Sequence, residues 1–140
     1  MLTLDFSLGV SPIATSLLDH PLLQRLCLRG RVVDLTGLET LLRSGTSKIT
    51  ELEIDRRRAG GSPTMGLKPV LQALERHLTL TKLGLRYCRP GRHEAKQLRM
   101  ALRMTTSSLQ SLALTNSPLG SAGWEELAQA LYQNTSIKEL

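Results

Sequence analysis

Hydrophobic residues recur along this chain in the pattern L-x-x-L-x-L. The pattern occurs as LQRLCL at 23–28, ITELEI at 49–54, LTKLGL at 80–85 and LQSLAL at 109–114, and it begins again as IKEL at 137–140. Successive starts are 26, 31, 29 and 28 residues apart. The last two apolar residues of each complete motif are two positions apart, as Leu26 and Leu28 are, which predicts a strand with one buried side. Recurrence at a nearly constant period predicts that one structural unit is used several times.

Helical spacing of apolar residues appears between these motifs. The predicted helix stripes are Leu67, Leu71 and Leu74, then Ala95, Leu98 and Leu102, then Leu127 and Leu131, with Gly123 opening the last helix. Leu2 and Leu4 indicate an initial strand before the first motif. A helix between two strands is the usual connection in a parallel sheet. The sequence therefore predicts an α/β fold with parallel strands.

The segment LQSLALTNSPLGSAGWEELAQALYQNTS, at 109–136, is the best-formed unit. It resembles the leucine-rich repeat, in particular the ribonuclease-inhibitor-like subclass with a full helix in each repeat. Ser117, and Cys88 one unit earlier, occupy the position that usually holds Asn or Cys. The resemblance implies an α/β leucine-rich repeat solenoid, a horseshoe segment with parallel strands on the concave side and helices on the convex side.

The pattern divides the chain unevenly. Residues 1–22 match it poorly and are interpreted as a degenerate N-terminal repeat or cap, and residues 23–140 as about four repeats, the last one truncated. The second repeat contains the insertion RRRAGGSPTMG at 56–66, whose Gly and Pro predict a surface loop. Because the chain stops at Leu140 within a strand motif, we expect it to be a piece of a longer protein or of an incomplete gene model.

Composition agrees with a repeated core. The chain has 30 leucines against four isoleucines and four valines, and hydrophobic residues make up 41% and charged residues 21%. No apolar run is long enough for a transmembrane helix, and the N-terminal segment does not resemble a signal peptide, so a cytoplasmic location is expected. The two cysteines are expected to be free thiols, with Cys27 the more exposed and reactive.

Candidate chemistry is sparse. His20, His77 and His93 lack partners at metal-ligand spacing, and no phosphate-binding loop or nucleophile motif occurs. We expect no cofactor, no metal and no enzymatic activity. The resemblance instead implies a non-catalytic protein–protein interaction scaffold, the repeat part of a larger intracellular signalling or regulatory protein. Its repeats are similar to those of intracellular NLR receptors and of TORNADO-like GTPase-associated proteins.

The outward residues of the predicted strands form the expected docking surface for a partner protein. Their signs alternate from repeat to repeat, as in Arg25, Glu51 and Lys82, and in Arg29, Asp55 and Arg86, which favours cross-strand pairing. The complete predicted surface is Arg25, Cys27, Arg29, Glu51, Glu53, Asp55, Lys82, Arg86, Tyr87 and Thr115.

A net charge of +6 leaves alternatives open. One is binding of nucleic acid or anionic lipid through two basic groups. These groups are Arg56, Arg57 and Arg58, then Arg89, Arg92, Lys96, Arg99 and Arg103. A solvated helix face is the simpler interpretation of the second group. Another alternative, which no particular residue supports, is a GTPase-activating or GTPase-associated module. Trp124 is expected to pack under a loop.

Overall fold

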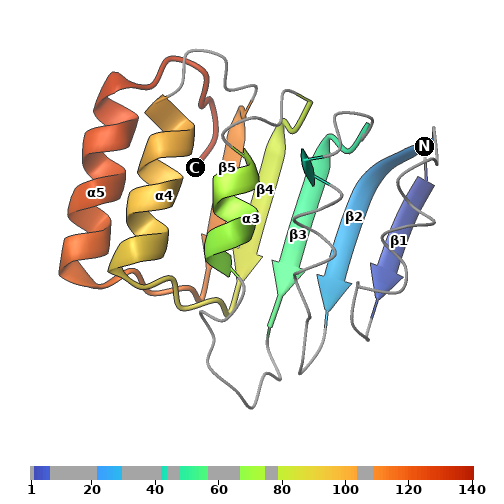
Figure 1. Ribbon diagram of the computed structural model, residues 1–140, viewed down its shortest axis with the longest axis horizontal. Coiled ribbons are helices and arrows are strands. Elements are labelled where there is room, and N and C mark those ends of the chain that lie inside the picture. Colours follow the sequence, from blue (N-terminus) through green and yellow to red (C-terminus); the bar gives the residue numbers. More distant parts are fainter. Residues whose placement is uncertain are drawn as a thin grey trace.

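Five strands form one parallel sheet in the order of the chain, as Figure 1 shows from β1 to β5. The computed structural model describes residues 2–6, 22–29, 42–43, 48–56, 67–74, 79–103 and 109–140. The strands are β1 (Leu2–Phe6), β2 (Leu23–Arg29), β3 (Glu51–Asp55), β4 (Lys82–Arg86) and β5 (Ser111–Thr115). The predicted strands, including the initial one, are confirmed. The predicted α/β class with parallel strands is confirmed as well.

Register places the apolar residues of successive motifs side by side. Leu26, Leu52, Leu83 and Leu112 form one column across β2–β5, and Leu28, Ile54, Leu85 and Leu114 form a second. A slip by one residue would turn every one of these side chains to the opposite face of the sheet. The leucine pattern therefore fixes which residues are available on the other face.

The backbone hydrogen bonds between successive motifs extend beyond the bounds of the strands, both just before each strand and past β5. Backbone N–H groups of Thr50, Thr81, Gln110 and Lys138 each donate to the residue one motif earlier, over 2.7–2.8 Å. Ser111 also pairs with Glu139 in an isolated parallel bridge. Residues 137–140 thus continue the sheet past β5 in the register of the earlier motifs.

Helices α3 (Leu67–Leu74), α4 (Arg92–Arg103) and α5 (Gly120–Gln133) lie side by side, in chain order (Figure 1). Their buried residues share one core with the strand leucines; these are Val70, Leu71, Ala73, Ala95, Leu98, Leu102, Leu127 and Ala130. The helices therefore cover the apolar face of the sheet. None of the helices in the described ranges is long and apolar enough to cross a membrane.

Helix α5 differs from its prediction. It begins at Gly120, not Gly123, and its buried stripe is Gly123, Leu127 and Ala130, with Leu131 only partly buried. Gly123 faces inward, where an added Cβ would lie 2.8 Å from Leu119 Cβ. Trp124 does not share this stripe and is 52% exposed, so the expectation that it packs under a loop is wrong.

The leucine columns can be tested with Leu85→Ala. Leu85 is fully buried between Ile54 and Leu114 in register, so the variant should lose about 3 kcal/mol of unfolding free energy. Lys82→Ala on the same strand, with a side chain 57% exposed, should change it by less than about 0.5 kcal/mol. Urea denaturation followed by circular dichroism measures both, and equal stabilities would contradict the assigned core.

Candidate functional site

The sheet face opposite the helices carries polar and small residues in register. We call it the polar sheet face. Its columns across β2–β5 are Arg25–Glu51–Lys82–Ser111, Cys27–Glu53–Gly84–Ala113 and Arg29–Asp55–Arg86–Thr115. The charge columns predicted from the sequence are confirmed. The residues predicted for docking therefore lie together on β2, β3 and β4, with Thr115 on β5 and Tyr87 directly after β4.

Glu51 lies at the centre of the first column. Its Oε2 is 2.6 Å from Arg25 Nε, and its Oε1 is 3.7 Å from Lys82 Nζ. The short contact to Arg25 is an ion contact without hydrogen-bond alignment. Because all three side chains are partly exposed, each pair contributes only about 0.2–1 kcal/mol. Their main effect is to hold two cations on either side of one carboxylate.

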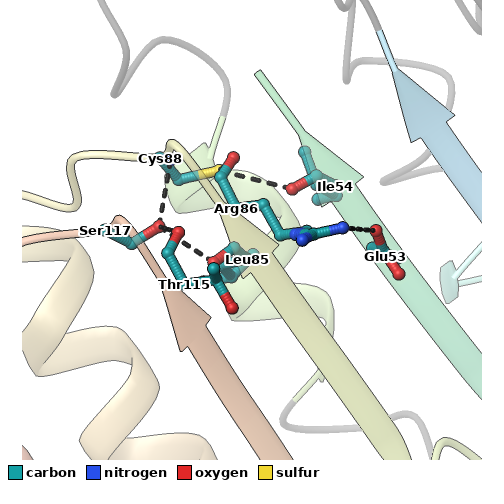
Figure 2. A network of polar contacts seen from close by, with 7 residues as sticks. All are labelled: Glu53, Ile54, Leu85, Arg86, Cys88, Thr115 and Ser117. Carbon is teal, nitrogen blue, oxygen red and sulfur yellow. Dashed lines mark hydrogen bonds and ion pairs between the residues drawn. The ribbon is translucent and has the colours of Figure 1, made fainter. Parts of the chain in front are cut away.

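Arg86 contacts Glu53, which lies diagonally from it across the sheet. Arg86 Nη1 is 3.5 Å from Glu53 Oε1, as Figure 2 shows. The register partner of Glu53 is Gly84, and a Cβ added there would lie 3.4 Å from Glu53 Cγ. The glycine therefore leaves room for the Glu53 side chain to lie across β4 towards Arg86.

Two predicted docking residues are buried. Cys27 is 8% exposed and Asp55 is 5% exposed, so the expectations of an exposed, reactive Cys27 and an outward-presented Asp55 are wrong. Both have short side chains on strands that are paired on both sides. Alternation predicts the direction in which a side chain points, but not how far longer neighbours rise above it. Neither residue is accessible to a partner.

The other predicted docking residues are accessible to different extents. Lys82 is exposed, and Arg25, Glu51, Glu53, Arg86, Tyr87 and Thr115 are partly exposed. Arg29 ends β2 opposite Asp55, and its side chain lies outside the described residues. The accessible part of the polar sheet face is thus a mixed-charge surface.

A buried polar network closes the ends of β4 and β5 (Figure 2). The Ser117 hydroxyl accepts a hydrogen bond from the Cys88 backbone N–H at 3.1 Å. It lies 2.9 Å from the Leu85 carbonyl and 3.1 Å from the Thr115 carbonyl, to one of which it donates. One buried side chain thus satisfies backbone groups of two successive units, which apolar surroundings would otherwise leave unpaired.

Cys88 occupies the equivalent position one unit earlier and is fully buried. Its Sγ lies 3.5 Å from the Arg86 carbonyl and 3.7 Å from the Ile54 carbonyl. Burial raises the pKa of the Cys88 thiol to about 11. The nearby charge of Arg56 opposes this effect, whereas that of Asp55 adds to it. The thiol is therefore a neutral structural donor, and not an activated nucleophile.

Arg56 was expected in a surface loop with anion-binding residues, but it is buried, at 6% exposed. Burial lowers the pKa of its guanidinium. Its backbone N–H donates to the Arg86 carbonyl at 3.0 Å, so it continues the ladder directly after β3. This correction removes Arg56 from the candidate anion-binding residues. Arg57 and Arg58 lie outside the described residues.

The chain turns sharply after β4 and β5. Tyr87 and Asn116 follow these strands at equivalent positions and have positive φ angles of 54° and 49°. The left-handed conformation costs an ordinary residue about 1–2 kcal/mol, whereas Asn tolerates it better. The turn directs the next inward side chains, Cys88 and Ser117, into the core. Each of these turns is thus followed at once by a buried side chain of the polar network.

The second basic group lies on and before α4. Arg89, Arg92, Lys96 and Arg103 are exposed, as is His93. Arg99 is instead held by α5, with its Nη1 2.7 Å from Glu126 Oε2 and 3.0 Å from Gln129 Oε1. Basic residues therefore lie along the exposed side of α4, although the charge of Arg99 is neutralised by Glu126.

Sequence reasoning missed two sets of polar contacts. Thr50 and Thr81 hydroxyls donate to the carbonyls of Gln24 and Thr50. Asn134 donates to the Leu102 carbonyl at the end of α4 and accepts from the backbone N–H groups of residues 136 and 137. A Thr at the second position of two successive motifs was a detectable signal, whereas no pattern indicated Asn134.

The parts of the chain that the structure describes contain no group of three or more His, Cys, Asp or Glu that could hold a metal ion. Cys27 and Cys88 are both free thiols and both buried. What the arrangement presents is a surface whose charged side chains are held in ion pairs.

Comparison with known proteins assigns no family. No protein-family model matches the chain. No curated protein matches it either. The interpretation of the polar sheet face therefore depends on its own geometry.

The buried network can be tested with Ser117→Ala. Loss of the hydroxyl leaves the Cys88 N–H and a carbonyl unpaired, so the free energy of unfolding should fall by about 1–3 kcal/mol. Ser117→Cys should recover part of this loss, because a thiol serves at the equivalent position of Cys88. Chemical denaturation compares the three proteins. A wild-type stability for Ser117→Ala would contradict the role of the hydroxyl.

The raised pKa of Cys88 predicts a loss of stability at alkaline pH. The unfolded thiol, at its ordinary value of 9.0, releases its proton before the folded thiol, at about 11. Stabilisation by the neutral thiol is thus complete below pH 9 and is lost as pH rises to about 11, by on the order of 2 kcal/mol. The Cys88→Ala variant has no thiol and therefore lacks this pH-dependent contribution to stability. The difference in unfolding free energy between wild type and variant should shrink over this range, and a constant difference would contradict it.

Proposed function

We propose that this chain is part of a leucine-rich repeat solenoid of the ribonuclease-inhibitor-like subclass, and that its polar sheet face binds another protein without catalysis. Support for the repeat assignment comes from the strict chain order of the parallel strands and the leucine columns in register. Each connection between successive strands from β3 to β5 contains one helix, α3 or α4. In such a solenoid the strands line the concave side.

The observation that carries the docking proposal is the fixed charge pattern of the polar sheet face. Glu51 holds Arg25 and Lys82 on either side, and Glu53 holds Arg86 across Gly84. Because these side chains are already held in place, binding of a partner costs less conformational entropy. Alternating signs suit a partner with its own specific charge pattern better than a uniform polyanion.

The remaining expectations belong to the same proposal. The protein would act as the recognition part of a larger cytoplasmic signalling or regulatory protein, as the resemblance to NLR-type repeats implies. No particular observation favours a GTPase-associated module over this function.

A charge exchange tests the docking face while preserving the fold. Glu53→Arg combined with Arg86→Glu keeps the net charge and the diagonal ion pair, but it inverts the pattern that a partner meets. The matched control exchanges the helix pair, Arg99→Glu with Glu126→Arg, which leaves the polar sheet face unchanged. Each tagged protein is used to capture partners from an extract of the cells that make it, with quantitative mass spectrometry.

Partners that dock on the polar sheet face should be lost at least about tenfold with the sheet exchange and retained with the helix exchange, because buried charge pairs at interfaces couple strongly. Thermal melts of both variants confirm that they are folded. If the sheet exchange captures the same proteins as wild type, or if both exchanges lose them equally, the docking assignment is wrong.

A further inference from the structure

An open groove lies on the helix side of the molecule, between α4 and α5. These two helices are side by side in Figure 1. The groove has a volume of about 390 Å³ and is lined by Arg99, Arg103, Ala128, Gln129, Tyr132 and Gln133. It is separated from the polar sheet face by the core, so a ligand there would not compete with docking on the strands.

One wall of the groove is held in place by an ion pair. Arg99 binds Glu126 at 2.7 Å and donates to Gln129 at 3.0 Å, and both charged side chains are only about one-fifth exposed. Their charges neutralise each other. The pair therefore fixes the spacing of α4 and α5 at this level, and does not itself attract an anion.

Arg103 lies one helical turn further along α4 and is exposed. No carboxylate among the described residues forms an ion pair with it. Opposite it, Tyr132 on α5 is 92% exposed, a large aromatic surface without cover from the described chain. Arginine and tyrosine are the residues most enriched at protein-binding hot spots. The groove thus pairs an available guanidinium with an available ring.

Charge along the two helices selects the kind of partner. Arg92 and Lys96 extend the positive charge of Arg103 along the exposed side of α4, whereas the exposed Glu125 lies in the first half of α5. A nucleic acid presents closely spaced phosphates and binds through uniform basic tracks and stacked aromatic platforms. The exposed carboxylate of Glu125 would repel such a chain. A short acidic protein segment can contact α4 and avoid this carboxylate.

We propose that the α4–α5 groove is a second docking surface, which binds an acidic segment of a partner protein. A carboxylate of this segment pairs with Arg103, and an adjacent apolar side chain packs on Tyr132. Arg92 and Lys96 increase the rate of association through their charge. The fixed Arg99–Glu126 pair keeps the groove open before the segment arrives.

Binding of labelled probes to the full chain tests this proposal. The probes are a fluorescein-labelled peptide of about ten residues that alternates Glu with Leu, the same peptide with Lys in place of Glu, and a single-stranded oligonucleotide of similar length. Fluorescence anisotropy at low and at moderate salt measures the dissociation constants. The Glu peptide should bind more tightly than the other two probes, and more weakly as salt rises.

Variants then locate the site. Arg103→Glu and Tyr132→Ala should each weaken Glu-peptide binding by about tenfold, because both change exposed groove residues without disturbing the core. The matched control is Lys48→Glu, which makes the same charge change at an exposed position outside the groove and should alter binding by less than about twofold. Circular dichroism melts verify folding.

Each other outcome overturns the proposal. Equal losses with Arg103→Glu and Lys48→Glu would show attraction to net charge only. Tighter binding of the oligonucleotide would indicate a nucleic-acid surface, and absence of Glu-peptide binding would remove the ligand class. The Glu53–Arg86 exchange should leave peptide binding unchanged, so that this proposal and the proposed function fail separately.

Discussion

Register between the parallel strands is the constraint on which both surfaces of this protein depend. The backbone hydrogen bonds that join Thr50 to Gln24, Thr81 to Thr50 and Gln110 to Thr81 set it, and the leucine columns maintain it. A slip by one residue would bury the charges and expose the leucines, at a cost far greater than any surface ion pair returns. The cross-strand contacts of Glu51 are thus a consequence of the core, and contribute little to holding it together.

The ends of β4 and β5 show how the same unit tolerates different residues at one position. Ser117 binds backbone groups through a short hydroxyl contact at 2.9 Å, whereas Cys88 uses a larger and weaker thiol at 3.5 Å. Both positions are reached through a residue with positive φ, which is favourable for Asn116 and strained for Tyr87. The buried position therefore requires a small hydrogen-bonding side chain and a tight turn, and the chemical identity of the donor is secondary.

Much of the fold was predictable, because the spacing of apolar residues along the sequence indicates the face of the sheet to which each side chain points. The motif spacing located the strands, and the charge columns followed from it once Arg25, Glu51 and Lys82 were aligned. The burial of each side chain was not predictable, because it depends on neighbours that are close in space but distant in the sequence. Cys27 and Asp55 point to the polar sheet face but are buried, and Trp124 is exposed because α5 turns Gly123 inward beside Leu119. The diagonal contact of Arg86 with Glu53 lies beside Gly84 and joins residues of different columns, so the alignment of columns could not predict it.

The two candidate surfaces differ in how their charges are balanced, and this difference sets what each can recognise. On the polar sheet face each carboxylate of Glu51 and Glu53 already has a cation, so a partner must exchange weak solvent-exposed contacts for its own. Charge attraction alone therefore adds little free energy to binding, which depends on how well the charge pattern of the partner matches that of the polar sheet face. On the helix side, Arg103 has no ion pair with the described residues, and an incoming carboxylate adds an interaction without breaking one. The proposed functions differ accordingly, with selection of a particular partner by the polar sheet face and capture of a short acidic segment by the α4–α5 groove.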